Sequence, residues 1–281
     1  MGNLVYYHHP DDHQYSLTYV SRDRSELSSP DGGIIEHYEF DDEFFVLYTD
    51  GNATGTVADV DDDFGGVLDT MPQDIRVITV RFLQIFEGVV EEMEAEEGEK
   101  LRIYKQIEVE KIPDALEEVE WTGSAVAVAA QLLSTLVLKH TLPNANHRTS
   151  IGLAEWYLES AESGFSLPSL ATDEYSWKSW VDTYITESKR VLTVRRNVTA
   201  FSLLQEWGCE VVKRKGGIEI PLREYALDMP QSEAYQYYAE RHTDLCEEFV
   251  RESVERAGHD ELLRMGGPTK SEFAVYLNRA K

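Results

Sequence analysis

The stretch of the sequence best equipped for chemistry is a polar run of ten residues in the middle of the chain. Residues 140–149 read His-Thr-Leu-Pro-Asn-Ala-Asn-His-Arg-Thr. An apolar segment precedes this run, and a segment with helical spacing of apolar residues follows it. A helix that begins directly after a short link presents backbone N–H groups and a positive dipole end, which together bind anions. The run therefore indicates a site for a phosphate group.

Four side chains of this run have the chemistry that such a site needs. Arg148 would stand in the first turn of the second helix, where its guanidinium forms a charged fork for phosphate. Asn144 and Asn146 are short enough to support a tight loop and to donate to an anion. His140, at the rim, could take a proton from an attacking hydroxyl group. Taken alone, His140 would also fit a helix-terminal histidine that interacts with the helix dipole.

The same run resembles the signature of the Fic/Doc (Fido) family. In that signature a histidine is followed two positions later by an apolar residue. After a gap of one come an acid, a small residue and asparagine, and an arginine follows after one more position. The matching residues are His140, Leu142, Ala145, Asn146 and Arg148. The Ala-Asn-x-Arg-Thr form is similar to the Doc (death-on-curing) branch, and the likeness extends over residues 123–168.

The resemblance implies a mainly α fold whose Fido-type helical core binds ATP or another nucleoside triphosphate. It implies that His140 is the general base, that Arg148 pairs with the β- or γ-phosphate, and that Asn146 contributes to an anion hole. The implied nucleotide-binding residues are Asn144, Ala145, Asn146, His147 and Arg148. Members of the family transfer AMP or, in the Doc branch, phosphate to a hydroxyl side chain of a protein target. A protein target and an antitoxin protein are therefore the implied partners.

Three positions depart from the family pattern. Asn144 stands where the family usually places the acid that holds Mg²⁺, and an amide carbonyl brings no charge to the cation. His147 replaces the usual lysine or glycine. Ile151 replaces the second arginine of adenylylating members, which favours phosphate transfer. Asn144 leaves two alternatives open: a transferase assisted by Mg²⁺, or a catalytically impaired module that binds nucleotide or recognises a partner.

The elements that must position this run follow from the spacing of apolar residues. Residues 125–140 are apolar almost all round, which predicts a buried central helix with Ser124 as its N-cap. A second helix is expected over residues 149–163, and a further one from Pro72 onward. Residues 101–112 alternate apolar and charged side chains and favour a hairpin over a helix end. The resemblance makes this hairpin the candidate for a flap that pairs with the target backbone.

The remaining segments complete a mainly helical protein with a β-rich N-terminal region. Short runs of β-branched and aromatic residues, separated by Gly and Asp turns, predict the strands 15–20, 34–40 and 43–48. Later in the chain the expected elements are helices over 173–191 and 194–207, a hairpin over 211–221, and helices from Gln231 with a break at 266–268. We therefore expect a β-rich region over residues 1–70, a Fic/Doc-like helical domain over 71–207, and a hairpin plus C-terminal helical extension over 208–281.

The composition limits the partners and the compartment. The chain has 52 acidic and 26 basic residues, a formal charge of −26, so its surface repels nucleic acid. The acids are spread along the chain, which is typical of halophilic proteins that stay soluble in high salt. The N-terminus lacks an apolar signal core, and the most apolar run, residues 125–138, is too short to span a bilayer. We expect a cytoplasmic protein with no membrane contact, in which Cys209 and Cys246 are ordinary thiols.

Two further clusters admit more than one interpretation. His8, His9 and His13, interleaved with aspartates, suggest either a metal site or, more simply, a solvated surface turn. The basic residues Lys189, Arg190, Arg195, Arg196 and 213–215 stand out in an acidic chain. They would border a nucleotide, a target or RNA, or balance nearby acids, and the last interpretation is favoured.

Overall fold

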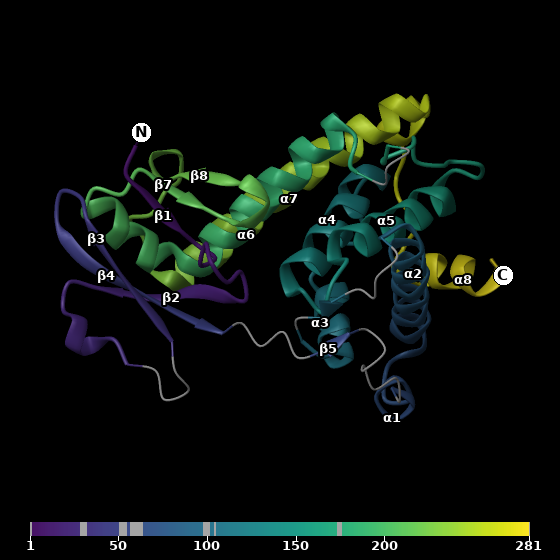
Figure 1. Ribbon diagram of the computed structural model, residues 1–281. Helices are drawn as coiled ribbons and strands as arrows, with labels where there is room; N and C mark the ends of the chain where they lie inside the picture. Colours follow the sequence, from purple (N-terminus) through teal and green to yellow (C-terminus); the bar gives the residue numbers. More distant parts are fainter. Residues whose placement is uncertain are drawn as a thin grey trace. The chain divides into compact units, whose positions relative to one another are not determined.

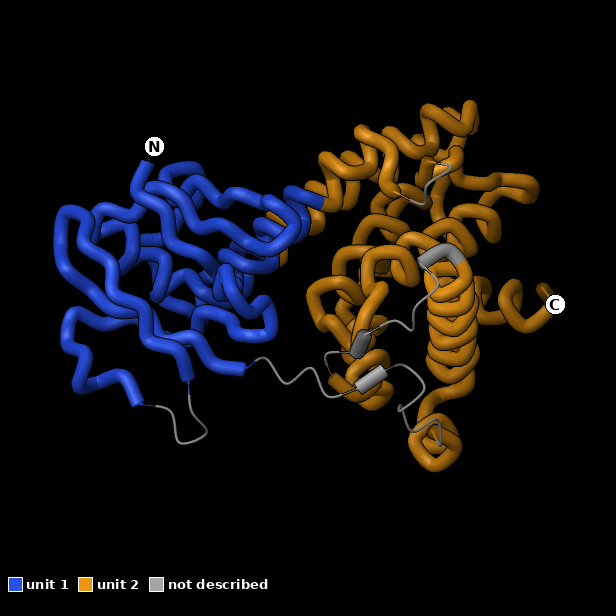
Figure 2. The backbone as a smooth tube through the Cα atoms, in the orientation of Figure 1, with its two compact units in different colours: residues 1–53, 186–238 blue, residues 54–185, 239–281 orange. Residues whose placement is uncertain are grey.

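The computed structural model describes residues 2–28, 33–50, 55–56, 64–97, 102–103, 105–172 and 176–280. It is mainly helical, and most of its strands lie in the N-terminal part of the chain (Figure 1). The expected mainly α fold with a β-rich N-terminal region is therefore confirmed. The chain divides into two compact units, unit 1 (Met1–Ala53 with Thr186–Tyr238) and unit 2 (Thr54–Ile185 with Ala239–Lys281), as Figure 2 shows.

These units differ from the expected consecutive regions 1–70, 71–207 and 208–281. Strand β1 (Leu4–Tyr6) pairs in parallel with β7 (Val211–Lys213). One sheet therefore contains residues from the first expected region, 1–70, and from the third, 208–281. The spacing of apolar residues reports local structure and carries no signal for such long-range pairing. Each unit is consequently built from two separate segments of the chain.

The antiparallel sheet of unit 1 confirms the three strands that the sequence predicts. Its strands are β2 (Tyr15–Ser21), β3 (Ile34–Glu39) and β4 (Glu43–Asp50), in the order β2-β4-β3. Aromatic and β-branched residues fill the inner face, and Phe44 is fully buried. The hydroxyl of Tyr48 donates to the backbone oxygen of Tyr6 at 2.7 Å and so ties this sheet to β1.

The expected hairpin over residues 211–221 is also confirmed. Strand β8 (Glu219–Pro221) runs antiparallel to β7. Gly216 and Gly217, between the strands, adopt φ values of 73° and 75°. Glycine reaches this left-handed region without a steric cost, which makes the tight connection possible.

Helices α6 (Ser179–Glu206) and α7 (Gln231–Ala257) each contribute residues to both units. The two helices expected over 173–191 and 194–207 correspond to two helical stretches of α6 that meet at a kink at Asn197, and residues 173–175 lie outside the described part. Asn197 interrupts the helical geometry with φ −128°, and its amide donates to the backbone oxygen of Thr193 at 2.7 Å. The expected break between two helices is therefore present, a few residues later in the chain than the sequence predicted.

Unit 2 is a helical assembly around α4. Its main helices are α2 (Gln73–Glu97), α3 (Ile112–Glu117), α4 (Ala125–Lys139), α5 (Asn146–Ala161) and α8 (Lys270–Arg279). Helix α4 packs against α3 and α5, while α2 packs against α5 and α8. The expected cap is confirmed, since Ser124 accepts a hydrogen bond from the backbone N–H of Ala127. At Gly152 of α5, a Cβ atom would lie 2.9 Å from Cγ2 of Ile85, so glycine allows α2 and α5 to approach closely.

The buried helix α4 is too short to cross a bilayer. It has 15 residues, whereas a spanning helix needs about 20. Across the described residues, no helix combines the length and the apolar character that a membrane span requires.

The hairpin expected over residues 101–112 is wrong. Strand β6 (Arg102–Ile103) pairs with β5 (Gly55–Thr56), and the turn η3 (Val109–Lys111) then leads into α3. Val109 and Ile112 are both buried. Their spacing of three fits one face of a helical turn, so the alternation was a misleading signal. Residues 101 and 104 lie outside the described part of the chain.

The interpretation of the N-terminal histidines as a solvated turn is wrong for two of them. His8 and His9 are 8% and 4% exposed. The backbone N–H of Lys215 donates to Nδ1 of His8 at 3.2 Å, and His9 Nε2 lies 3.2 Å from a carboxylate oxygen of Glu36. No metal-ligand group forms at these histidines within the described residues. Burial, followed by the positive charges of Arg214 and Lys215, lowers the pKa of His8 to about 3.

We predict that His8 makes unit 1 sensitive to acid. In the unfolded chain this histidine has its ordinary pKa of 6.5, so between that value and about 3 the unfolded state binds the extra proton. Its stabilising contribution is complete above pH 6.5 and is lost as the pH falls toward 3. The variant His8→Asn keeps an acceptor for the N–H of Lys215 but cannot bind the proton. Its unfolding equilibrium constant should therefore depend less on pH than that of the wild type, by up to about a factor of ten per pH unit.

Chemical denaturation at several pH values between about 4 and 7 measures this difference. The exposed residue His37 provides the matched control, since His37→Asn should retain the wild-type slope. Equal slopes for wild type and His8→Asn would contradict the prediction.

Candidate functional site

The turn that joins α4 to α5 is held in a conformation that ordinary residues rarely adopt. His140, the C-cap of α4, has φ 51°, and Ala145, the N-cap of α5, has φ 54°. A left-handed backbone costs about 1–2 kcal/mol for a residue with a Cβ atom. Two such residues within one short turn persist because the surrounding structure determines their conformation, and such strain is concentrated at functional sites.

Helix α5 begins at Asn146, three residues before the expected start. His147 and Arg148 therefore belong to its first turn, which confirms the expected place of Arg148. Ala145 makes no side-chain capping hydrogen bond to α5, although its backbone oxygen accepts from the N–H of Thr149 at 3.0 Å. A helix start of this kind carries partial positive charge and suits an anion.

Asn146 holds the turn together through its side chain. Its Oδ1 accepts from the backbone N–H of Leu142 at 3.1 Å, and its Nδ2 donates to the backbone oxygen of Leu142 at 2.9 Å. Asn146 is 6% exposed and Leu142 is fully buried. The carboxamide is thus engaged by the loop's own backbone, so any contribution of Asn146 to an anion hole would come from its backbone N–H.

Asn144 is also engaged within the turn. Its Oδ1, the oxygen that would face a metal ion, accepts from the backbone N–H of Ala145 at 2.7 Å. The preceding residues attach the turn to the segment before α3, because the N–H of Glu108 donates to the backbone oxygen of Thr141 at 2.9 Å. The buried hydroxyls of Thr141 and Ser150 have no hydrogen-bond partner among the described residues. Unsatisfied buried groups of this kind call for a structural or functional explanation.

Two aromatic residues lie beside the first turn of α5. The guanidinium of Arg148 sits over the ring of Trp177, 3.9 Å from its centroid, and the ring of His147 meets that of Tyr184 edge-on at 6.4 Å. Stacking on an aromatic face fixes the plane of a guanidinium, whose N–H donors lie along its edge. No sequence pattern linked Trp177 to Arg148, because Trp177 lies beyond the end of α5 and outside any helical repeat with Arg148.

His140 is half-buried and does not belong to the hydrophobic interior. The structure therefore brings His140, Asn144, Ala145, Asn146, His147 and Arg148 together in one turn, at the junction of two packed helices. The turn consists of a strained backbone, an imidazole at one end and a guanidinium at the other. The helix start and the guanidinium can bind an oxyanion, and the imidazole can accept a proton beside it.

A second polar cluster, in unit 2, resembles a nucleophile with its base but is sealed from solvent. Nδ1 of His242 lies 2.8 Å from the hydroxyl of Ser134 and 3.6 Å from the sulfur of Cys246, and all three residues are fully buried. Burial raises the pKa of Cys246 to about 12, and burial likewise raises that of Cys209 to about 12. Both thiols are therefore protonated near neutral pH, and the cluster connects α4 with α7 rather than supplying a nucleophile.

Three of the basic residues that stand out in the sequence make contacts within unit 1. Nη1 of Arg214 donates to the backbone oxygen of Lys189 at 3.0 Å, Nε of Arg195 donates to the backbone oxygen of Tyr235 at 2.9 Å, and Arg190 pairs with Glu187 at 3.4 Å. The pair between Arg190 and Glu187 fits the interpretation that the basic residues balance nearby acids, whereas Arg214 and Arg195 bind backbone oxygens.

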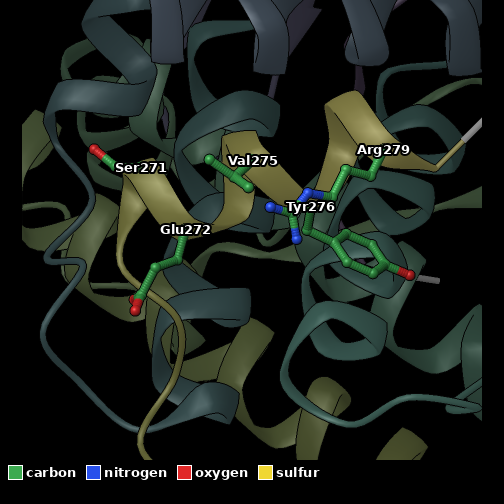
Figure 3. A pocket seen from close by; sticks show the side chains of 5 residues that line it. All are labelled: Ser271, Glu272, Val275, Tyr276 and Arg279. Carbon is green, nitrogen blue, oxygen red and sulfur yellow. The ribbon is translucent and has the colours of Figure 1, made fainter.

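A shallow hollow lies along α8 in unit 2. Its volume is about 400 Å³, and Figure 3 shows its lining side chains, which are Ser271, Glu272, Val275, Tyr276 and Arg279. Val275 is 49% exposed at this surface. None of the site residues expected from the sequence lines the hollow, so it does not enlarge the α4–α5 site.

Comparison with known proteins gives one match. A family model described as DUF8172, a family of unknown function, matches residues 1–281. The chain belongs to DUF8172. No curated protein and no solved structure gives a significant match to this DUF8172 chain.

We predict that the clamp between Asn146 and Leu142 stabilises the turn of the DUF8172 chain. The variant Asn146→Ala leaves the buried N–H and carbonyl of Leu142 without these partners, which should lower the free energy of unfolding by about 1–3 kcal/mol. Denaturant unfolding of both proteins measures the loss. Asn144→Ala is the matched control and should cost less, because Asn144 is half-buried. A loss no larger than that of the control would count against the clamp.

Proposed function

We propose that the DUF8172 chain is a Fic/Doc-like transferase with a Fido-type helical core in unit 2. It would move a phosphoryl or AMP group from ATP or another nucleoside triphosphate to a hydroxyl side chain of a protein target. The observation that carries the proposal is the α4–α5 turn, where His140 and Arg148 flank a helix start that has no side-chain cap. A toxin held in check by an antitoxin protein is the biological setting that the resemblance favours.

Phosphate binding rests on charge that the fold supplies at the start of α5. The N-terminal dipole and the backbone N–H groups of residues 146–148 provide partial positive charge. Arg148 adds a full charge, and its stacking on Trp177 holds the guanidinium in one plane. In a chain of net charge −26, this local positive charge would direct a polyphosphate to the turn.

His140 would act as the general base. Its neutral imidazole takes the proton of the target hydroxyl as that oxygen attacks phosphorus. The new phosphorus–oxygen bond forms while the bond to the leaving group breaks, and the leaving group carries away the electron pair. Attack at the γ-phosphate releases a nucleoside diphosphate, and attack at the α-phosphate releases pyrophosphate. Ile151, in place of a second arginine, favours the first of these outcomes.

The residues of the turn do not fit a Mg²⁺ site. Mg²⁺ prefers carboxylate oxygens together with phosphates, and Asn144 offers a neutral oxygen that already accepts from the N–H of Ala145. No step of the proposed transfer therefore passes through a metal ion at this turn. The same observation favours a second candidate function, in which the turn binds nucleotide or a protein partner without catalysis.

We predict that labelled ATP will distinguish these functions. The protein is incubated with a cell lysate and with ATP labelled at the γ- or the α-phosphate, in low and high KCl. Protein labelling from the γ position indicates phosphate transfer, and labelling from the α position indicates AMP transfer. His140→Ala should reduce labelling by about 10²-fold or more, as expected for loss of a general base.

The exposed residue His37 again provides a matched control, since His37→Ala should label proteins like the wild type. Nucleotide binding without labelling, equal in wild type and His140→Ala, supports the non-catalytic module. Wild-type labelling by His140→Ala contradicts the assignment of the base. Absence of both binding and labelling contradicts the nucleotide site itself.

We also predict that a carboxylate at position 144 introduces a dependence on Mg²⁺. In the variant Asn144→Asp, the added charge supplies the ligand type that Mg²⁺ prefers beside phosphates. Calorimetry with a non-hydrolysable ATP analogue should show that Mg²⁺ tightens binding by roughly tenfold, equivalent to about 1.4 kcal/mol. Wild type should respond less. The same response in both proteins would show that another part of the chain supplies the metal ligands.

A further inference from the structure

Three metal-ligating side chains meet where two helices of unit 2 end. Glu162 is the C-cap of α5, and His259 and Glu261 follow the end of α7, Glu261 within the turn η6 (Asp260–Leu263). One ligand atom from each residue lies within 4.8 Å of the other two. Gly258, with φ 77°, ends α7 and turns the chain so that His259 reaches Glu162.

The contacts within this cluster bring its donor atoms together. Nδ1 of His259 lies 2.7 Å from Oε1 of Glu162, and the ring of Phe165 packs edge-on against the imidazole at 5.4 Å. The other carboxylate oxygen of Glu162 is buried and has no hydrogen-bond partner among the described residues. A buried carboxylate oxygen of this kind is costly unless a proton donor or a cation satisfies it.

The electrostatics of the cluster favour a cation. Two carboxylates at this separation repel each other unless they share a proton or a positive ion. The C-terminal ends of α5 and α7 add partial negative charge from their last carbonyl groups. One imidazole with two carboxylates is a donor set that suits Zn²⁺ and its neighbours among the divalent transition metals, whereas Mg²⁺ and Ca²⁺ prefer oxygen alone.

We propose that Glu162, His259 and Glu261 bind one divalent transition-metal ion of the Zn²⁺ type. The metal takes the place of the proton that lies between His259 and Glu162, and that proton goes to the solvent. Bound there, the ion would join the end of α5 to the link between α7 and α8 and so stabilise unit 2. The proposal does not depend on the transferase function, because the donor atoms belong to a different cluster of side chains.

Zn²⁺ and Co²⁺ added to the full chain test the proposal. Calorimetry should find one equivalent of Zn²⁺ per chain, the thermal midpoint should rise with Zn²⁺, and Co²⁺ should give the visible absorption bands of a low-coordinate site. The variants His259→Ala and Glu261→Gln each remove a ligand and should weaken binding by roughly tenfold or more. Glu261 is exposed, so Glu261→Gln removes a ligand without disturbing the core.

Two controls keep the result specific in an acidic chain. Glu255→Gln removes an exposed acid of α7, and His37→Ala removes an exposed histidine that pairs with Glu43 at 3.0 Å but belongs to no three-ligand group among the described residues. Both variants should bind Zn²⁺ like the wild type. Absence of stoichiometric binding, or binding that Glu261→Gln and His259→Ala leave unchanged, would overturn the proposal.

Discussion

Two hydrogen bonds between the carboxamide of Asn146 and the backbone of Leu142 close the turn on which the candidate site depends. They hold the end of α4 and the start of α5 at a fixed separation, with Leu142 buried beneath them. His140 and Ala145, which lie on either side of Leu142, both have a left-handed backbone, so the chain turns sharply around this closure. The same buried amide therefore joins the backbone segments from which His140 and Arg148 extend, and stacking on Trp177 fixes the plane of the guanidinium.

Much of this turn is readable in the sequence because its determinants are local. The apolar run before His140, the serine cap and the apolar spacing after Arg148 all lie within a few residues of the elements they specify. The sequence alone does not decide the role of Asn146. An asparagine in a loop suits either a ligand or the backbone, and only the burial of Leu142 identifies the second role.

Contacts between residues far apart in the sequence could not be predicted from the spacing of apolar residues. The alternation in residues 101–112 predicted a hairpin, yet β6 pairs with β5 and the later residues turn into α3. Likewise, Trp177 beneath Arg148 and His259 beside Glu162 are brought into place by tertiary packing. Periodicity carries no information about such pairs. The break between the two helices of α6 lies at Asn197, a few residues beyond the place that the spacing of apolar residues indicated.

The parallel pairing of β1 with β7 has a consequence for how the protein is made. In this pair Leu4 lies opposite Val211. Strand β1 can therefore pair with β7 only after some two hundred further residues have been synthesised. Until then the unpaired edge of β1 can form hydrogen bonds with another chain, and such aggregation is a known risk for folds in which distant residues must pair. Because the chain is rich in aspartate and glutamate, unfinished chains repel one another. The negative charge would therefore reduce aggregation during folding as well as keep the folded protein soluble.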